Sequence, residues 1–149
     1  EALIRVRLSY SSVMNTLADI QKAFQETNLA LKVGRLFYSE QNIFPYNELG
    51  IGRLIYRLPV SLCENFLSEI FGSPIPKTLD PELMATVNRF FLNNLNIAET
   101  ARQLHMHRNT LIYRLEQIEK QTGLDLRLFD DAMTFKIAMM VINYLKGNK

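Results

Sequence analysis

The sequence predicts a mainly α-helical fold in which a helix-turn-helix domain follows the remnant of a truncated α/β domain. Apolar residues recur at helical spacing through residues 96–123, where a turn of about three residues separates two helices. A further helix start is marked at residues 80–82 by an Asp-Pro-Glu run. Near the chain start, residues 3–8 alternate apolar and polar side chains, as a half-buried strand does.

The first strand needs partners. Residues 3–8 alone cannot form a stable sheet, so we expect the missing strands upstream of a chain that starts without Met, as an excised fragment would. The next segment predicts a helix over residues 12–33, and Gly34 is expected to end it as a left-handed cap. A short strand over residues 42–46 follows, and Pro45 marks it as an edge strand.

Two further helices are predicted before the middle of the chain. They cover residues 50–56 and 60–71 and are separated at Pro59. The second contains Cys63, the single cysteine, at core spacing with neighbouring apolar residues, which favours a buried structural thiol over a reactive one. Residues 73–78, which read SPIPKT, are the best linker candidate and divide the chain into residues 1–72 and 73–149.

Residues 80–94 predict a helix with Asp80 as its cap. Its core face is formed by Val87, Phe90 and Phe91. A final helix starts at Asp130 or Asp131 and is apolar almost all round, so it is either deeply buried or shared with a partner. We favour sharing, which predicts a homodimer whose contact includes the following side chains: Phe135, Met139 and Ile142.

The two helices within residues 96–123 have complementary apolar stripes. The stripes consist of Ile97, Ala101 and Leu104 in the first helix and of Leu111, Leu115 and Ile118 in the second. Asn96 can cap the first helix, and Glu99 can reach back to the Asn96 amide in a capping box. With the small Ala101 at the crossing point and a turn over residues 105–107, the pair is typical of a helix-turn-helix that binds double-stranded DNA.

Polar residues open the second helix, where side chains reach base edges. Arg108 can donate two hydrogen bonds to guanine, and Asn109 can pair with adenine in the same way. Thr110 and His107 suit phosphate oxygens, as does Arg114 further along the helix. The predicted DNA-binding set is His107, Arg108, Asn109, Thr110, Tyr113, Arg114 and Asn96.

Two features depart from the usual pattern. His105 stands in the turn where many such units have Gly, which costs backbone freedom if φ is positive there. Glu116 and Glu119 place negative charge further along the second helix. A helical protein-interaction or dimerisation module, in which residues 107–111 meet an acidic protein, therefore stays open as the alternative.

Residues 96–140 closely resemble the C-terminal DNA-binding domain of the PucR/CdaR family of bacterial transcriptional regulators. The motifs that carry the resemblance are HRNTL, YRL, TGLDLR and FDDA. The unit is also similar to that of the factor for inversion stimulation through Arg108 and Thr110, although Ile112 and Tyr113 replace its basic residues.

Upstream, the stretches TLADIQKAFQETNLALKVGRLF and YNELGIGRLIYRLP resemble the end of the degenerate GGDEF-like domain of these regulators. The resemblance implies control of catabolic or metabolic genes, often by activation. It is also compatible with a small-molecule effector that acts through upstream domains that this chain does not contain.

Charge and composition agree with a cytoplasmic DNA-binding protein. The net charge is +2, and residues 1–72 hold seven basic and seven acidic side chains against ten and eight in residues 73–149. This small excess of positive charge suggests that tight DNA binding needs two copies on paired half-sites.

A single cysteine excludes an internal disulfide and fits a reducing compartment. The longest apolar run, residues 137–142, is too short to cross a bilayer, so no membrane partner is expected.

No motif predicts catalysis. His105 and His107 are two residues apart in the turn, without further ligands at metal-binding spacing, so we expect no metal site. The two glycines of LGIGRL lack the remaining residues of a phosphate-binding loop. Cyclase chemistry would need a Gly-rich acidic loop that the chain does not have. We therefore expect neither an enzyme nor a cofactor.

Overall fold

A computed structural model describes residues 6–72 and 80–147. Within these residues the chain forms seven α-helices, two short 3-10 helices and one two-stranded sheet. They group into two compact units, one containing the described residues up to Cys63 together with those from Met140 onward, and the other spanning Glu64–Met139. The linker predicted at residues 73–78 lies outside the described residues, so the division at that point stays a prediction.

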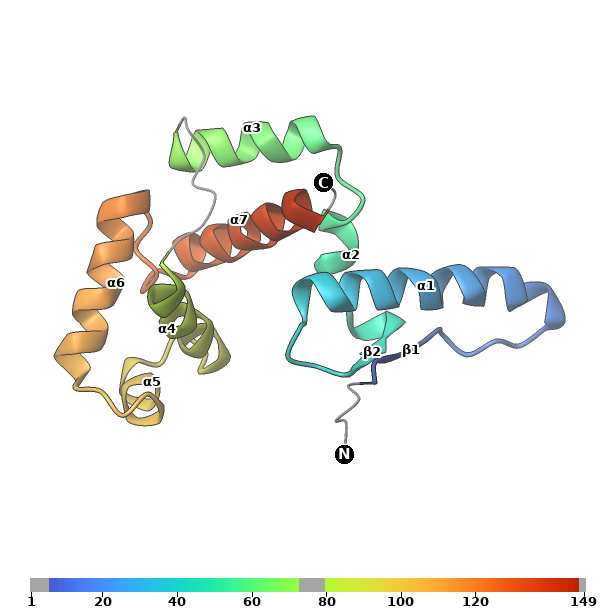
Figure 1. The fold of residues 1–149 in the computed structure, drawn as a ribbon, viewed down its shortest axis with the longest axis horizontal. Coiled ribbons are helices and arrows are strands. Elements are labelled where there is room, and N and C mark those ends of the chain that lie inside the picture. The colour runs from blue at the N-terminus through green and yellow to red at the C-terminus, as the bar shows by residue number, and fades with distance from the viewer. Residues whose placement is uncertain (1–5, 73–79, 148–149) are drawn as a thin grey trace. The chain divides into compact units, whose positions relative to one another are not determined.

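The first unit contains a small parallel sheet beside a long helix (Figure 1). Strand β1 (Leu8–Tyr10) pairs in parallel with β2 (Ile43–Pro45), and helix α1 (Ile20–Phe37) contacts both strands. The strand predicted over residues 3–8 overlaps β1 only at Leu8. Val6 and Arg7 lie before β1, and residues 3–5 of the predicted strand lie outside the described residues.

Gly34 corrects a second expectation. It does not end α1 but lies inside it, and the helix continues for three residues to Phe37. A Cβ built on Gly34 would lie 2.2 Å from the ring of Phe44 in β2. The glycine is needed for the close approach of helix and strand, and its φ is not in the left-handed region.

The rest of this unit follows the predicted order. A 3-10 helix (Leu17–Asp19) precedes α1, and a second one (Tyr46–Glu48) follows β2. Helix α2 (Gly52–Ile55) lies within its predicted range, and α3 (Val60–Phe71), of which only the part up to Cys63 belongs to this unit, matches its predicted range. Cys63 is buried, as predicted. The core of the unit consists of Ala30, Val33, Phe44 and Leu49.

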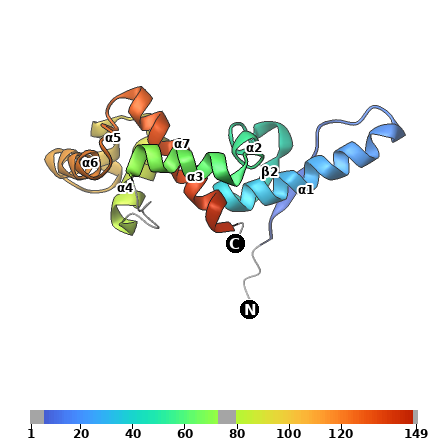
Figure 2. The same cartoon turned by 90° about the horizontal axis from the view of Figure 1, so that it is seen from above.

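The second unit contains the helices that the sequence assigned to DNA binding. They are α4 (Pro81–Leu92), α5 (Ile97–Gln103), α6 (Arg108–Thr122) and the part of α7 (Phe129–Gly147) up to Met139. Figure 2 shows α4, α5 and α6 gathered together, and each of them contacts the other two. The predicted apolar stripe of α6, formed by Leu111, Leu115 and Ile118, is buried and thereby confirmed.

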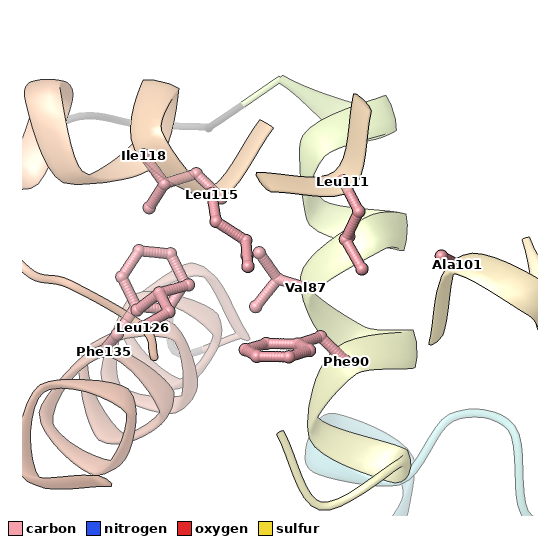
Figure 3. Close-up of a cluster of buried hydrophobic side chains, with 8 residues drawn as sticks. All are labelled: Val87, Phe90, Ala101, Leu111, Leu115, Ile118, Leu126 and Phe135. Atoms are coloured by element: carbon pink, nitrogen blue, oxygen red, sulfur yellow. The ribbon is translucent and has the colours of Figure 1, made fainter. Parts of the chain in front are cut away.

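One apolar cluster holds these helices together (Figure 3). Its members are Val87, Phe90, Ala101, Leu111, Leu115, Ile118, Leu126 and Phe135. Phe135 projects from α7 into this cluster and is fully buried. Its predicted role in a dimer contact is therefore corrected, because a side chain enclosed in its own core offers no surface to a second chain.

The other two residues expected at a dimer contact are also occupied within the chain. Met139 packs against the core of the second unit, and Ile142 is buried in the part of α7 that belongs to the first. In that part, the Tyr144 ring meets Tyr56 edge to face at 5.7 Å, and its hydroxyl donates to the Leu58 carbonyl at 3.2 Å.

In residues 6–72 and 80–147, no helix combines the length and the apolar character that crossing a bilayer requires.

Candidate nucleic-acid interface

Helix α4 begins at a well-formed cap. The Asp80 carboxylate accepts hydrogen bonds from the backbone N–H groups of Glu82 and Leu83, at 2.8 and 3.0 Å, and Pro81 occupies the first helical position. These contacts satisfy amides that a helix start otherwise leaves unpaired. The cap predicted at Asp80 is confirmed, and it defines the start of the helix on which α5 and α6 rest.

The turn from α4 to α5 is tight. Asn94 and Leu95 have positive φ values of 51° and 61°, and the Leu95 N–H donates to the Phe90 carbonyl at 3.0 Å. Asn tolerates this left-handed conformation better than Leu does. Leu95 is held there because its side chain packs against the apolar core. The turn therefore fixes the start of α5 relative to α4.

Only half of the predicted capping box at Asn96 forms. The Asn96 side chain accepts the Glu99 N–H at 3.0 Å, as expected. The Glu99 carboxylate, however, accepts hydrogen bonds from Arg102 and Gln103, while the Asn96 N–H donates to the Asn93 carbonyl. The hydrogen bond from Arg102 holds the pKa of the Glu99 carboxyl below its ordinary value. Asn96 thus serves as an exposed helix cap at the edge of the candidate interface.

The turn between α5 and α6 brings the second helix against the first. The Met106 N–H donates to the Ala101 carbonyl at 3.0 Å, and His105 between them has φ of 50°. The position where many units have Gly is therefore a left-handed one, so the condition under which His105 costs backbone freedom is met. His107 then caps α6, with its Nδ1 accepting the Asn109 N–H at 3.2 Å. The imidazole that was expected to meet a phosphate thus caps the helix.

The first turn of α6 presents polar side chains to solvent. Arg108, Asn109 and Thr110 are exposed, and Tyr113 follows one turn later with 57% of its surface accessible. Within residues 6–72 and 80–147, the Arg108 guanidinium has no hydrogen bond or ion pair, so nothing must be broken before it meets a base or phosphate. Because Leu111 and Leu115 anchor α6 in the core, Asn109 and Tyr113 are fixed on the opposite side, and Arg108 and Thr110 project from the first turn.

Arg114 has a different environment from Arg108. Its guanidinium donates a hydrogen bond of 2.9 Å to the Thr86 hydroxyl and forms an ion pair with Glu82, both in α4. Only 22% of its side chain is exposed. The structure therefore places Arg114 at the junction of α4 and α6, and its contact with DNA phosphate stays a prediction.

A group of charged residues at the end of α6 was missed as a functional feature. Arg127, in the segment between α6 and α7, donates to Asp125 at 2.6 Å and to Glu119 at 2.9 Å, and its Nη1 lies 4.0 Å from Glu116. The hydrogen bond from Arg127 holds the pKa of the Asp125 carboxyl below its ordinary value. One cation thus lies beside the two glutamates that place negative charge on α6. The TGLDLR motif contains this arginine, but sequence spacing does not reveal its partners.

The fold and the site define a helix-turn-helix domain of the DNA-binding type. Two short helices cross at a small residue, the second is anchored by an apolar stripe, and its first turn projects unengaged polar side chains. Residues 83–141 match the PucR C-terminal helix-turn-helix domain.

Curated proteins of bacteria are similar to this chain over most of its length. A purine catabolism regulatory protein of Bacillus subtilis is 32% identical over 90% of this chain and 25% of its own length. A carbohydrate diacid regulator of Escherichia coli is 29% identical over 93% of this chain and 36% of its own. A proline-responsive transcriptional activator of Bacillus subtilis is 30% identical over 86% of this chain and 32% of its own. The chain therefore spans between a quarter and about a third of these relatives, whose names support DNA-binding transcription regulation.

Proposed function

We propose that this chain is the DNA-binding part of a bacterial, cytoplasmic transcriptional regulator that reads the major groove with α6. The observation that carries the proposal is the exposed first turn of α6, in which Arg108, Asn109 and Thr110 are accessible while the buried stripe anchors the helix in the core. Arg and Asn in the first turn of a recognition helix are suited to bidentate contacts with guanine and adenine.

The remaining predicted contacts are proposed as supporting ones. Tyr113 continues the exposed side of α6, and Asn96 lies at the start of α5, where its amide nitrogen can donate to a phosphate oxygen. His107 is proposed to contact phosphate with the ring nitrogen that does not cap the helix. These groups would position the domain on the duplex, while Arg108 and Asn109 would supply most of the sequence preference.

The biological role is inferred from the relatives. Their names refer to purine catabolism, a carbohydrate diacid and proline, so we propose that the regulated genes are catabolic or metabolic and that activation is the sense of control. We further propose that residues 1–72 are the end of a GGDEF-like domain and that residues 73–149 form the DNA-binding domain. An effector would then act through domains outside this chain, and the active species on DNA would be a homodimer.

The test is a DNA titration with a selected sequence. Binding sites are enriched from a random duplex pool, and affinity for the best duplex and a scrambled duplex is measured at several salt concentrations. We expect log K to fall linearly with log salt because phosphate contacts release counterions. We also expect tighter binding to the selected duplex. A protein-interaction module would give no enriched sequence and equal, weak affinity for both duplexes.

A further inference from the structure

Three exposed or half-exposed apolar side chains line one side of the first part of α7. Phe129, Met133 and Ile137 follow one another at intervals of four residues and therefore share a side of the helix. Phe129 is 70% exposed and Met133 45% exposed, although both lie in a helix whose other side is in the core. Such a row of apolar side chains is typical of a contact surface.

A groove runs beside this row. It has a volume of about 340 Å³ and lies between α7 and the end of α4, with Phe91 and Leu95 on the α4 side and Phe129 and Met133 on the α7 side. The Nζ of Lys136 lies 5.9 Å from the centre of the Phe91 ring, which places a cation at the groove wall. The groove is wide enough to receive an apolar side chain from another molecule.

The charged side chains beside this apolar row favour a second copy of α7 as the binding partner. Asp130 and Lys136 are both exposed and lie three residues before and three residues after Met133. Within residues 6–72 and 80–147, neither forms an ion pair. If two copies of α7 pair antiparallel about Met133, each Asp130 faces the Lys136 of the other copy, and each Phe129 faces Ile137. A parallel pairing would instead set like charges against each other.

We propose that this surface, formed by Phe129, Asp130, Met133, Lys136 and Ile137, binds a second copy of this chain in an antiparallel α7 pair. The pairing is self-complementary, which is the condition for a closed twofold dimer. It replaces the contact that the sequence suggested, because Phe135 faces the core and Met133 faces out. The inference rests on the proposed function in one respect, since two linked copies would allow a weakly basic domain to hold paired half-sites.

The test measures association of the 149-residue chain without DNA. Sedimentation velocity over a range of concentrations should show a reversible dimer, because a contact of two helical turns from each copy is small. Met133→Glu should weaken dimerisation by roughly tenfold or more, since it places a charge at the centre of the pair. The matched control is Leu54→Glu, which adds the same charge at a 68% exposed position of α2 and should leave the dimer unchanged.

A charge-swap experiment tests whether Asp130 and Lys136 lie in the contact between the two copies. Asp130→Lys and Lys136→Asp should each reduce self-association, because each sets like charges face to face. An equimolar mixture of the two variants should associate again, since every facing pair is then of opposite sign. Circular dichroism checks that both variants are folded.

Three results would overturn the proposal: a wild-type monomer at every concentration, a dimer indifferent to Met133→Glu, or a mixture of the charge variants that stays monomeric. DNA binding is measured separately, on a single half-site. A folded, monomeric Met133→Glu variant that still binds the half-site would support the proposed DNA-binding function independently of the dimer proposal.

Discussion

Arg114 of α6 donates a hydrogen bond of 2.9 Å to the hydroxyl of Thr86 in α4. Thr86 is only 1% exposed, and its own hydroxyl donates to the Glu82 carbonyl at 3.0 Å, so the hydroxyl both donates and accepts. The contact joins α6 to α4 six residues after Arg108. It therefore helps to fix the rotation of the recognition helix about its axis.

Arg114→Ala should lower the free energy of unfolding by about 1 kcal/mol, because a partly buried hydrogen bond to a charged group is lost. The ion pair with the exposed Glu82 adds little to this figure. The same variant should weaken binding to all duplexes alike. Urea denaturation and DNA titrations at several salt concentrations measure the two effects.

Thr86→Val separates the two roles of Arg114. This variant removes the acceptor but leaves the guanidinium available for phosphate. If Arg114 acts by orienting α6, Thr86→Val should also weaken binding without changing the salt slope. A salt slope reduced by about one in Arg114→Ala, with Thr86→Val binding normally, would instead assign Arg114 to a phosphate contact.

His105→Gly should raise the free energy of unfolding by about 0.5 to 1 kcal/mol, because a residue with a Cβ is strained at positive φ and glycine is not. The comparison is Leu95→Gly, at a similar φ of 61°. Leu95 packs against the core, so its loss should destabilise the protein despite the relief of strain. Thermal unfolding shows whether each variant is more or less stable than the wild-type protein. A destabilised His105→Gly variant would contradict the proposed strain at the turn.

The local features of the second unit could be predicted from the sequence because their causes are local. The cap at Asp80 and the stripe of α6 depend on residues within a few positions of one another. The capping box at Asn96 failed for a local reason too, since Arg102 and Gln103 compete for the Glu99 carboxylate. Spacing alone does not rank such competitors.

Features that depend on distant residues could not be predicted in this way. The partners of Arg114 lie 28 and 32 positions away, and Phe44, which explains Gly34, belongs to another element. The apolar character of α7 was correctly read, but the side that faces the core could not be chosen without the other helices. Phe135 was therefore assigned to a partner, although the chain's own core encloses it.

Gly34→Ala should destabilise the first unit. Alanine favours a helix interior by roughly 1 kcal/mol over glycine, but its Cβ would collide with the Phe44 ring, and such overpacking costs typically 1 to 3 kcal/mol. We expect the collision to dominate. Chemical denaturation measures the difference, and the double variant with Phe44→Leu should recover part of the loss. A more stable Gly34→Ala would refute the close approach of α1 and β2.

Arg127→Ala should weaken binding to every duplex by roughly 0.5 to 1 kcal/mol, because Glu116 and Glu119 lose a neighbouring cation on the DNA-binding helix. Adding Glu116→Gln and Glu119→Gln should restore the affinity. Salt titrations of the single and the triple variant measure both steps. If the glutamines restore nothing, Arg127 itself contacts DNA and the glutamates are irrelevant to binding.

Arg108→Ala should cost about 1 to 3 kcal/mol of binding free energy and relax the preference at one base pair, since the unengaged guanidinium at the start of α6 is suited to guanine. The free energy of unfolding should barely change, because the side chain is exposed and has no partner within the described residues. Arg108→Lys is the matched variant, as it keeps the charge but loses the two-pronged geometry. It should retain affinity for scrambled DNA and lose selectivity. Titrations on matched and singly mismatched duplexes decide the matter, and a folded Arg108→Ala protein with unaltered affinity and selectivity would rule out this readout.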